Sequence, residues 1–250
     1  MRSARPSSLR PQSQRVGLAR ALSKLGFCSR SEAERLIAEG RVTLDGKVQR
    51  NPEHPVIWNE ASICVDHQPV RAAKKIYAML NKPRGLVTTA SDEKGRPTVF
   101  ECLRGAELPF LSPVGRLDQA SEGLLLFTND SAWAERLTNP VHEIEKIYHA
   151  QINRVPDEAL VRDLERGIED EGEHLAARRV RVLRTGTRNG WLEITLTEGK
   201  HRQIRRLLAG FDIEVLRLVR VAIGPLELGA LAKGQWRFLT PEEVRMLEKS

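Results

Sequence analysis

Residues 114–123 read Val-Gly-Arg-Leu-Asp-Gln-Ala-Ser-Glu-Gly and lead directly into the apolar run Leu-Leu-Leu-Phe at residues 124–127. An apolar run of this length is too short for a typical helix and predicts a buried strand. The turn-forming residues 128–131 that follow predict the cap of a helix over residues 133–137. Asp118 is therefore expected on a tight loop before a core strand, where the scaffold can fix its side chain.

Considered alone, an aspartate between two glycines is most simply a residue that caps a turn. However, the stretch resembles the central motif of the RNA pseudouridine synthases, in the branch of the RsuA-type ribosomal enzymes. This resemblance implies that Asp118, which follows Gly-Arg-Leu, is the catalytic nucleophile. It also implies an α+β fold, in which a mixed, mainly antiparallel sheet is flanked by helices and RNA crosses a cleft at its middle.

Composition places the chain among soluble proteins that carry no metal cluster. No apolar run among the 250 residues reaches the length of a membrane span, and the N-terminus lacks the apolar segment of a secretory signal. The three cysteines, Cys28, Cys64 and Cys102, are widely spaced and form no metal-ligand pair. Reduced thiols are typical of a cytosolic protein, so a cytoplasmic location is expected.

The positive charge of the chain is concentrated at its beginning. Net charge is +7, and residues 1–50 hold eleven Lys and Arg against four Asp and Glu, which accounts for the whole excess. Such clustering indicates a region that approaches a polyanion, and binding to nucleic acid would then depend on salt. Solubility alone would give no reason for the clustering.

The N-terminal part divides into a tail and a small domain. Residues 1–14 contain arginines and serines but no acid, which predicts a disordered basic tail with loose RNA affinity; an organellar transit peptide is the alternative. Residues 15–65 are predicted to form two short helices followed by an Asp-Gly hairpin. This stretch resembles the alpha-L RNA-binding module of a small-subunit ribosomal protein. The resemblance implies RNA-backbone contacts by a set of basic residues: Arg15, Arg20, Lys24, Arg30 and Arg41.

A polar linker over residues 66–75 is expected to precede a catalytic domain over residues 76–250. Lys82-Pro83 with Gly85 resembles the first motif of the synthase family. We expect Lys82, Arg116 and Arg202 to contact RNA as well.

Two further stretches of the catalytic domain match the family in the right order. Residues 145–150 alternate as a strand, and the resemblance implies that Tyr148 stacks on the target base; a half-buried strand tyrosine is the structural alternative. Residues 197–208 resemble the third motif, in which a basic residue pairs with the catalytic aspartate. Residue-by-residue matching gives that role to Arg205.

The chemistry implied by the resemblance is consistent with this set of residues. Pseudouridine formation detaches uracil from its ribose and reattaches it through carbon, so no cofactor is expected, and the sequence contains no nucleotide-binding glycine motif. A carboxylate that stays ionised in a dry pocket needs a fixed opposite charge, for which an arginine is suited. Asp118 is expected to act as nucleophile or as base at the ribose, after the base has left its stack.

The predicted function is thus the site-specific isomerisation of uridine to pseudouridine in ribosomal RNA, free or in a pre-ribosomal particle, by a monomer. Two alternatives remain open at the level of sequence. One is a non-catalytic RNA-binding or ribosome-assembly protein that retains the fold. The other is a glycoside hydrolase, for which a second partner acid is missing. The sequence does not identify the target uridine or the ribosomal subunit.

Overall fold

The structure is a computed structural model that describes residues 15–250, so the predicted basic tail over residues 1–14 lies outside the described residues. The chain separates into two compact units, with the division between Lys74 and Lys75. Each unit has its own hydrophobic core.

The first unit contains two short helices, α1 (Leu18–Lys24) and α2 (Arg30–Ala38), which pack against each other. Their apolar faces form a core that includes Leu18, Leu22 and Ile37. Small antiparallel sheets complete the unit, with strands β1 (Val16–Gly17), β2 (Val42–Leu44), β3 (Lys47–Val48), β4 (Pro55–Val56), β5 (Ile63–Val65) and β6 (Gln68–Pro69).

The ends of these helices show how local sequence sets the path of the chain. Gly26 follows α1 with a left-handed φ of 74°, a conformation that glycine adopts without strain. Ser29 caps α2 and accepts the backbone N–H of Glu32 at 3.1 Å. The reciprocal half of a capping box is absent here, because the Glu32 carboxylate accepts from Arg35 instead, at 2.6 Å.

The predicted linker over residues 66–75 is only partly unstructured. Asp66 and His67 take left-handed conformations, with φ of 48° and 65°, and turn the chain into β6. This strand pairs with β5, and the Ala73 N–H donates to the carbonyl of Leu25 at 2.9 Å. The linker prediction was therefore wrong for these residues, because the turn gives their backbone groups partners within the small unit.

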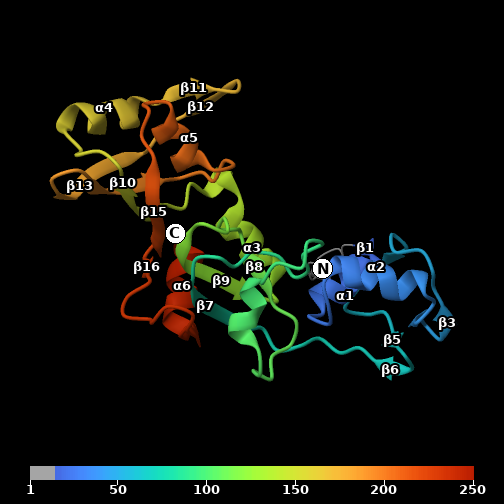
Figure 1. The fold of residues 1–250 in the computed structure, drawn as a ribbon. Helices are drawn as coiled ribbons and strands as arrows, with labels where there is room; N and C mark the ends of the chain where they lie inside the picture. Colours follow the sequence, from blue (N-terminus) through green and yellow to red (C-terminus); the bar gives the residue numbers. More distant parts are fainter. Residues whose placement is uncertain (1–14) are drawn as a thin grey trace, which may run out of the picture. The chain divides into compact units, whose positions relative to one another are not determined.

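The second unit is built on a large mixed sheet of nine strands, whose order is β13-β14-β10-β15-β9-β7-β17 with β16 beside β15 and β8 beside β9 (Figure 1). All pairings are antiparallel except that of β15 with β9, so the predicted mixed, mainly antiparallel sheet is confirmed. The strands are β7 (Tyr77–Lys82), β8 (Ser112–Val114), β9 (Glu122–Thr128), β10 (Lys146–Ile152), β13 (Arg179–Thr185), β14 (Gly190–Leu196), β15 (Val215–Ile223), β16 (Leu226–Glu227) and β17 (Trp236–Phe238).

The parallel junction at the centre of the sheet places the loop that carries Asp118. Arg220 on β15 pairs with Tyr148 on β10 and also with Gly123 on β9. Gly123 has a φ of 101°, and a Cβ atom there would lie 2.2 Å from the carbonyl oxygen of Arg220. Only glycine permits this approach. Because the Asp118 loop immediately precedes β9, the junction sets it beside Tyr148.

Helices cover the two halves of the sheet. On one half, α4 (Glu158–Arg166) and α5 (Gln203–Ala209) lie on the same side of β13 and β10 (Figure 1), over a core that includes Leu164, Leu192 and Leu207. The other half packs against α3 (Ser131–Thr138), which is capped by Asp130 within the turn predicted to supply a cap, and α6 (Pro241–Lys249). The remaining elements are the 3₁₀ helices η1 (Val99–Leu103) and η2 (Pro140–His142) and the hairpin β11 (Ile168–Asp170) with β12 (Glu173–Leu175). Among residues 15–250, no helix has the length and apolar character to cross a membrane.

Candidate active site

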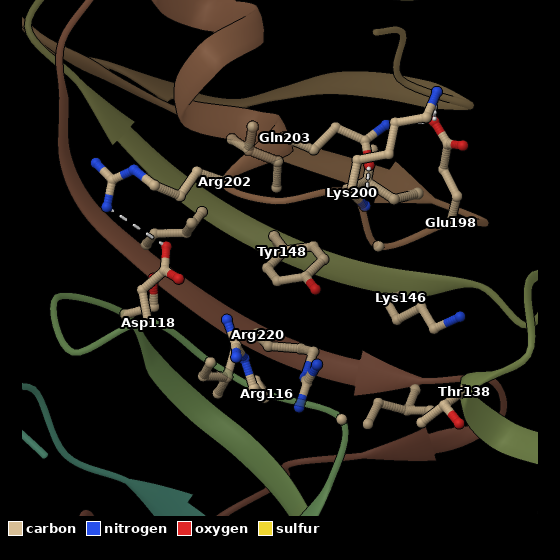
Figure 2. Close-up of a pocket in the computed structure, with 18 of the residues that line it drawn as sticks. Arg116, Asp118, Thr138, Lys146, Tyr148, Glu198, Lys200, Arg202, Gln203 and Arg220 are labelled. Atoms are coloured by element: carbon tan, nitrogen blue, oxygen red, sulfur yellow. Dashed lines mark hydrogen bonds and ion pairs between the residues drawn. The ribbon is translucent and has the colours of Figure 1, made fainter. Parts of the chain in front are cut away.

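A cavity of about 290 Å³ lies at the central junction of the sheet. Its wall combines the Asp118 loop, β10, β15 and the segment that leads into α5, and Figure 2 shows Tyr148 in the middle of these residues. Asp118, Tyr148 and Arg205, predicted from three separate stretches of sequence, all line it. The volume is close to the lower limit of small-molecule sites, at roughly 300 Å³.

Backbone contacts fix the Asp118 loop on the side away from the cavity. Ser121 donates its N–H to the carbonyl of Asp118 at 2.9 Å and closes a tight turn. Gly85 donates to the carbonyl of Gln119 at 2.8 Å, so the segment that follows β7 is joined to this loop. Within residues 15–250 the Asp118 carboxylate accepts no backbone N–H, so it does not cap the turn and is directed at the cavity instead.

Lys82 anchors the same loop from the interior. It has no exposed surface, and its ammonium donates to the carbonyls of Ser121 at 2.7 Å and of Pro83 and Asp118 at 3.1 Å. The prediction that Lys82 contacts RNA is therefore not supported, because its N–H groups are used within the fold. Burial lowers the pKa of Lys82 to about 8, although Glu122 and Asp118 favour its charged form.

The ionic partner of Asp118 differs from the predicted one. Arg202 lies 3.7 Å from the carboxylate and is the one cation within ion-pair distance of it among the described residues (Figure 2). Arg205 instead donates to the main-chain carbonyls of Val215 at 3.1 Å and Ala120 at 3.4 Å. Residue matching chose Arg205, but Arg202, which has a left-handed φ of 51° just before α5, is the arginine that lies at ion-pair distance from Asp118.

Arg205 nevertheless acts on the surroundings of Asp118. Its contact with the Ala120 carbonyl joins α5 to the Asp118 loop, 85 residues away in the chain. Burial lowers the pKa of Arg205, the Arg202 charge lowers it further, and attraction to Asp118 opposes both. The Asp118 side chain is 31 % exposed, so the carboxylate is reachable from solvent rather than enclosed in the dry pocket that we expected.

Two more cations, Arg220 and Lys146, line the cavity together with Tyr148. Arg220 is 5 % exposed and donates its Nε to the carbonyl of Leu124 at 2.7 Å, while its Nη2 has no partner. Lys146 makes one long contact, 3.4 Å, to the carbonyl of Thr197. Burial lowers the pKa of Lys146, and the nearby Arg220 charge adds to this. Neither cation has a carboxylate partner among the described residues.

Sequence reasoning missed both Lys146 and Arg220, although one of them left a signal. Val215–Ile223 alternates as a strand in which Leu218 and Ala222 are buried, so Arg220 occupies a position where the pattern calls for an apolar side chain. A charged residue at such a position indicates a functional or structural partner. Lys146, at the start of its strand, carried no comparable signal.

The remaining predicted RNA contacts are solvent-accessible to different degrees. Arg116 is exposed and lines the cavity. In the first unit, Arg15, Arg20 and Arg30 are exposed, and none has a carboxylate partner within residues 15–250. The other two are already engaged, since Lys24 lies 5.8 Å from the centre of the Trp58 ring and Arg41 pairs with Asp66 at 2.5 Å and with Glu39 at 3.3 Å.

The geometry of this pocket agrees with comparisons to known proteins. Residues 76–210 match the model of the RNA pseudouridylate synthase family, and residues 16–56 match that of the S4 domain. The chain therefore belongs to the RNA pseudouridine synthase family, whose members are isomerases, and carries an N-terminal S4 RNA-binding domain. The predicted family, fold class and enzyme class are confirmed.

Individual relatives cover nearly the whole chain. The chain is 36 % identical, over 92 % of its length and 94 % of the relative's, to the ribosomal large subunit pseudouridine synthase B of Bacillus subtilis. It is 37 % identical to an uncharacterised RNA pseudouridine synthase of Aquifex aeolicus, over 94 % of each. A crystal structure of a pseudouridylate synthase superposes with a TM-score of 0.66 at 27 % identity, covering 93 % of this chain and 99 % of that one.

Proposed function

We propose that this enzyme converts uridine to pseudouridine in large-subunit ribosomal RNA, with Asp118 as the group that acts on the ribose. The observation that carries the proposal is the position of the Asp118 carboxylate, which lines a cavity together with Tyr148 while its backbone is fixed by Lys82 and Ser121. The choice of subunit is supported by relatives, since the similar Bacillus subtilis and Escherichia coli proteins are named as large-subunit enzymes.

In the proposed reaction the bond between C1′ of the ribose and N1 of uracil breaks and a bond from C1′ to C5 forms. C5 loses its proton and N1 gains one, so atoms balance without a cofactor. Asp118 either attacks C1′ or removes a ribose proton, and both routes begin with the ionised carboxylate. Arg202, at 3.7 Å, and Arg205, which binds the adjacent Ala120 carbonyl, supply positive charge beside it.

The substrate base must leave its helical stack to reach this carboxylate. We assign the receiving surface to the Tyr148 ring, because it lies in the middle of the cavity wall (Figure 2). Lys146 and Arg220 line the same cavity, and the unpaired Nη2 of Arg220 and the ammonium of Lys146 suit a phosphate or carbonyl oxygen of the extruded nucleotide.

The S4 domain is proposed to hold the RNA outside the catalytic pocket. Arg15, Arg20 and Arg30 are exposed cations on this domain and suit phosphate contacts, which position a protein without reading sequence. We further propose that the protein works as a monomer in the cytoplasm. Three cysteines without a disulfide, of which Cys28 is buried, support the location.

The test is to map pseudouridine in ribosomal RNA from a strain that lacks this protein. One uridine of the large-subunit RNA should lose its modification and regain it when the purified wild-type enzyme is added. The small-subunit RNA serves as the internal control and should be unchanged. Loss of a small-subunit site, with the large-subunit RNA fully modified, would contradict the proposed substrate but leave the activity intact.

A further inference from the structure

After residue 50 the chain has equal numbers of acidic and basic residues, but one short segment is rich in arginine. Residues 178–188 hold five arginines and no acid, and all five are exposed. Most of them belong to β13, the strand at one edge of the large sheet, or to the turn that follows it. The five, called the edge arginines here, are Arg178, Arg179, Arg181, Arg184 and Arg188.

The strand directs part of this charge to the face of the sheet opposite α4 and α5. Val180 points into the core beneath these helices, so its neighbours Arg179 and Arg181 point the other way. An irregularity between Val182 and Arg184 keeps Arg184 on that same opposite face, where its guanidinium lies 4.9 Å from the centre of the Trp191 ring.

An open groove of about 410 Å³ runs over this face beside the edge arginines. Trp191 forms its floor, and the guanidinium of Arg217 lies 5.8 Å from the indole centre. The groove is separate from the catalytic cavity, because the two share no lining residue. Its walls are His149, Leu183, Arg184, Trp191, Arg217, Val219 and Val221.

Little negative charge offsets the edge arginines. Of the five, Arg181 alone has a carboxylate partner within residues 15–250, and that partner, Glu193, is shared with His149. The exposed arginines of α4 behave differently, since Arg162 and Arg166 each pair with an acid of their own helix. The edge arginines thus retain charge that a polyanion can neutralise.

We propose that the edge arginines and the groove beside Trp191 form a second RNA-binding surface, which holds the phosphate backbone of the substrate RNA outside the catalytic pocket. Arginine binds phosphate through several N–H groups at once, and an aromatic floor flanked by guanidinium groups suits unpaired nucleotides. The inference rests on the proposed activity on RNA, and it adds a contact beyond the S4 domain and the active site.

Two other roles could account for arginines at this edge. Charged side chains on an edge strand prevent pairing with another sheet. That role needs no aromatic groove, and here the Val180 N–H is already bound by Glu165 at 2.8 Å. An acidic protein segment would also suit the charge, but the substrate of this family is itself a polyanion.

The experiment measures RNA binding in the Asp118→Asn background, so that no reaction intervenes. A large-subunit ribosomal RNA transcript is titrated against the triple variant Arg179→Gln, Arg184→Gln, Arg188→Gln at several salt concentrations. The matched control is Arg154→Gln, Arg162→Gln, Arg166→Gln, which removes three exposed, acid-paired arginines from the same domain. Melting temperatures and gel filtration show whether each variant is folded and free of aggregates.

Affinity of the edge variant is expected to fall about tenfold or more, and the slope of log affinity against log salt to decrease by about two. The control should change neither quantity appreciably. In the wild-type background, the edge variant should raise KM for the transcript and leave kcat unchanged. If the edge variant bound RNA with the same affinity and the same salt slope as the control variant, the proposal would be overturned. Aggregation of the edge variant in gel filtration would indicate instead that these arginines protect the edge strand. Because binding is read without turnover, an error in the proposed reaction would not affect this result.

Discussion

The cations around the active site and those on the sheet edge are the same residue types in opposite surroundings. Lys82 is fully buried and Arg220 nearly so, and both bind main-chain carbonyls rather than carboxylates. Arg179 and Arg184 are exposed, and neither has an acidic partner within residues 15–250. Burial thus decides what a positive charge does in this molecule.

A buried cation costs desolvation energy, so it persists where it fixes geometry or supports a reaction. An exposed cation costs little and gains affinity for a polyanion when counterions are released. The first kind should therefore alter kcat and the pH dependence of folding, whereas the second should alter KM and its dependence on salt.

The largest effect within the buried group is expected for Lys82→Met. Methionine fills a similar volume but leaves the carbonyls of Pro83, Asp118 and Ser121 without their donor. The Asp118 loop should shift, and a misplacement of about 1 Å can cost about 100-fold in rate. Single-turnover kinetics should show this loss in the rate of the reaction. The affinity for RNA should stay within about threefold of the wild-type value, which is a small difference in binding free energy. An unchanged kcat would mean that the loop does not need its buried anchor.

Arg205→Lys should have the next largest effect. Lysine cannot reach the Val215 and Ala120 carbonyls together in the way the guanidinium does, so the link between α5 and the Asp118 loop is lost. A charged hydrogen bond contributes about 1.5–3 kcal/mol, which corresponds to roughly 10- to 100-fold in kcat.

Arg202→Lys is the matched comparison for Arg205→Lys. It keeps a positive charge near Asp118, in a partner that is 46 % exposed, and should cost only a few-fold. If Arg202→Lys were the more damaging of the two, the direct ion pair rather than the main-chain link would be the important contact.

The pH dependence of stability should reveal the buried charge of Lys82. Its pKa falls from 10.5 in the unfolded chain to about 8 in the folded protein, so between these values the unfolded chain binds more protons. Stability from this group is therefore lowest below pH 8 and rises toward pH 10.5, by about 1–3 kcal/mol. Urea unfolding of the wild type and of Lys82→Met across this range should show a rise in the difference between them. A constant difference would indicate a normal lysine pKa.

Tyr148→Phe, like Arg202→Lys, should have a small effect. The phenyl ring keeps the surface for stacking, so RNA affinity should match that of the wild type, and only a contact by the hydroxyl group is lost. A lost neutral hydrogen bond of about 1 kcal/mol corresponds to roughly fivefold in kcat. Tyr148→Leu, which removes the ring, should be worse, and equal rates for the two variants would argue against stacking.

Sequence predicted the elements of this fold where one local rule decides them. The run Leu124–Phe127 became a strand buried on both faces, and Asp130 capped α3 as expected. At Ser29 only half of a capping box forms, because Glu32 has a competing arginine one turn away. The family resemblance also implied that Asp118 and Tyr148 act on the same nucleotide, and both line one cavity in the structure.

The surroundings of individual site residues could not be predicted from the sequence, because they depend on which strands and loops lie next to one another in the fold. Lys82 has the appearance of a surface cation in a polar turn, and only the parallel junction of β9 with β15 shows that it is enclosed. Arg202 lies just before α5 and Arg205 lies in its first turn, so backbone conformation rather than spacing decided which one reaches Asp118. The edge arginines were overlooked because counts over long segments average them against acids elsewhere.

The most direct test of the account is the single-turnover rate of Asp118→Asn with a large-subunit ribosomal RNA transcript that lacks the modification. The isosteric amide keeps the loop, whose main-chain contacts do not involve this side chain. We predict a rate at least about 10⁴-fold below that of the wild type, as for loss of a central catalytic group, with RNA affinity unchanged within about threefold. Asp163→Asn, at a half-buried carboxylate of α4, is the control and should react normally. Pseudouridine formed by Asp118→Asn at a rate near that of the wild type would contradict the assignment of the chemistry to this residue.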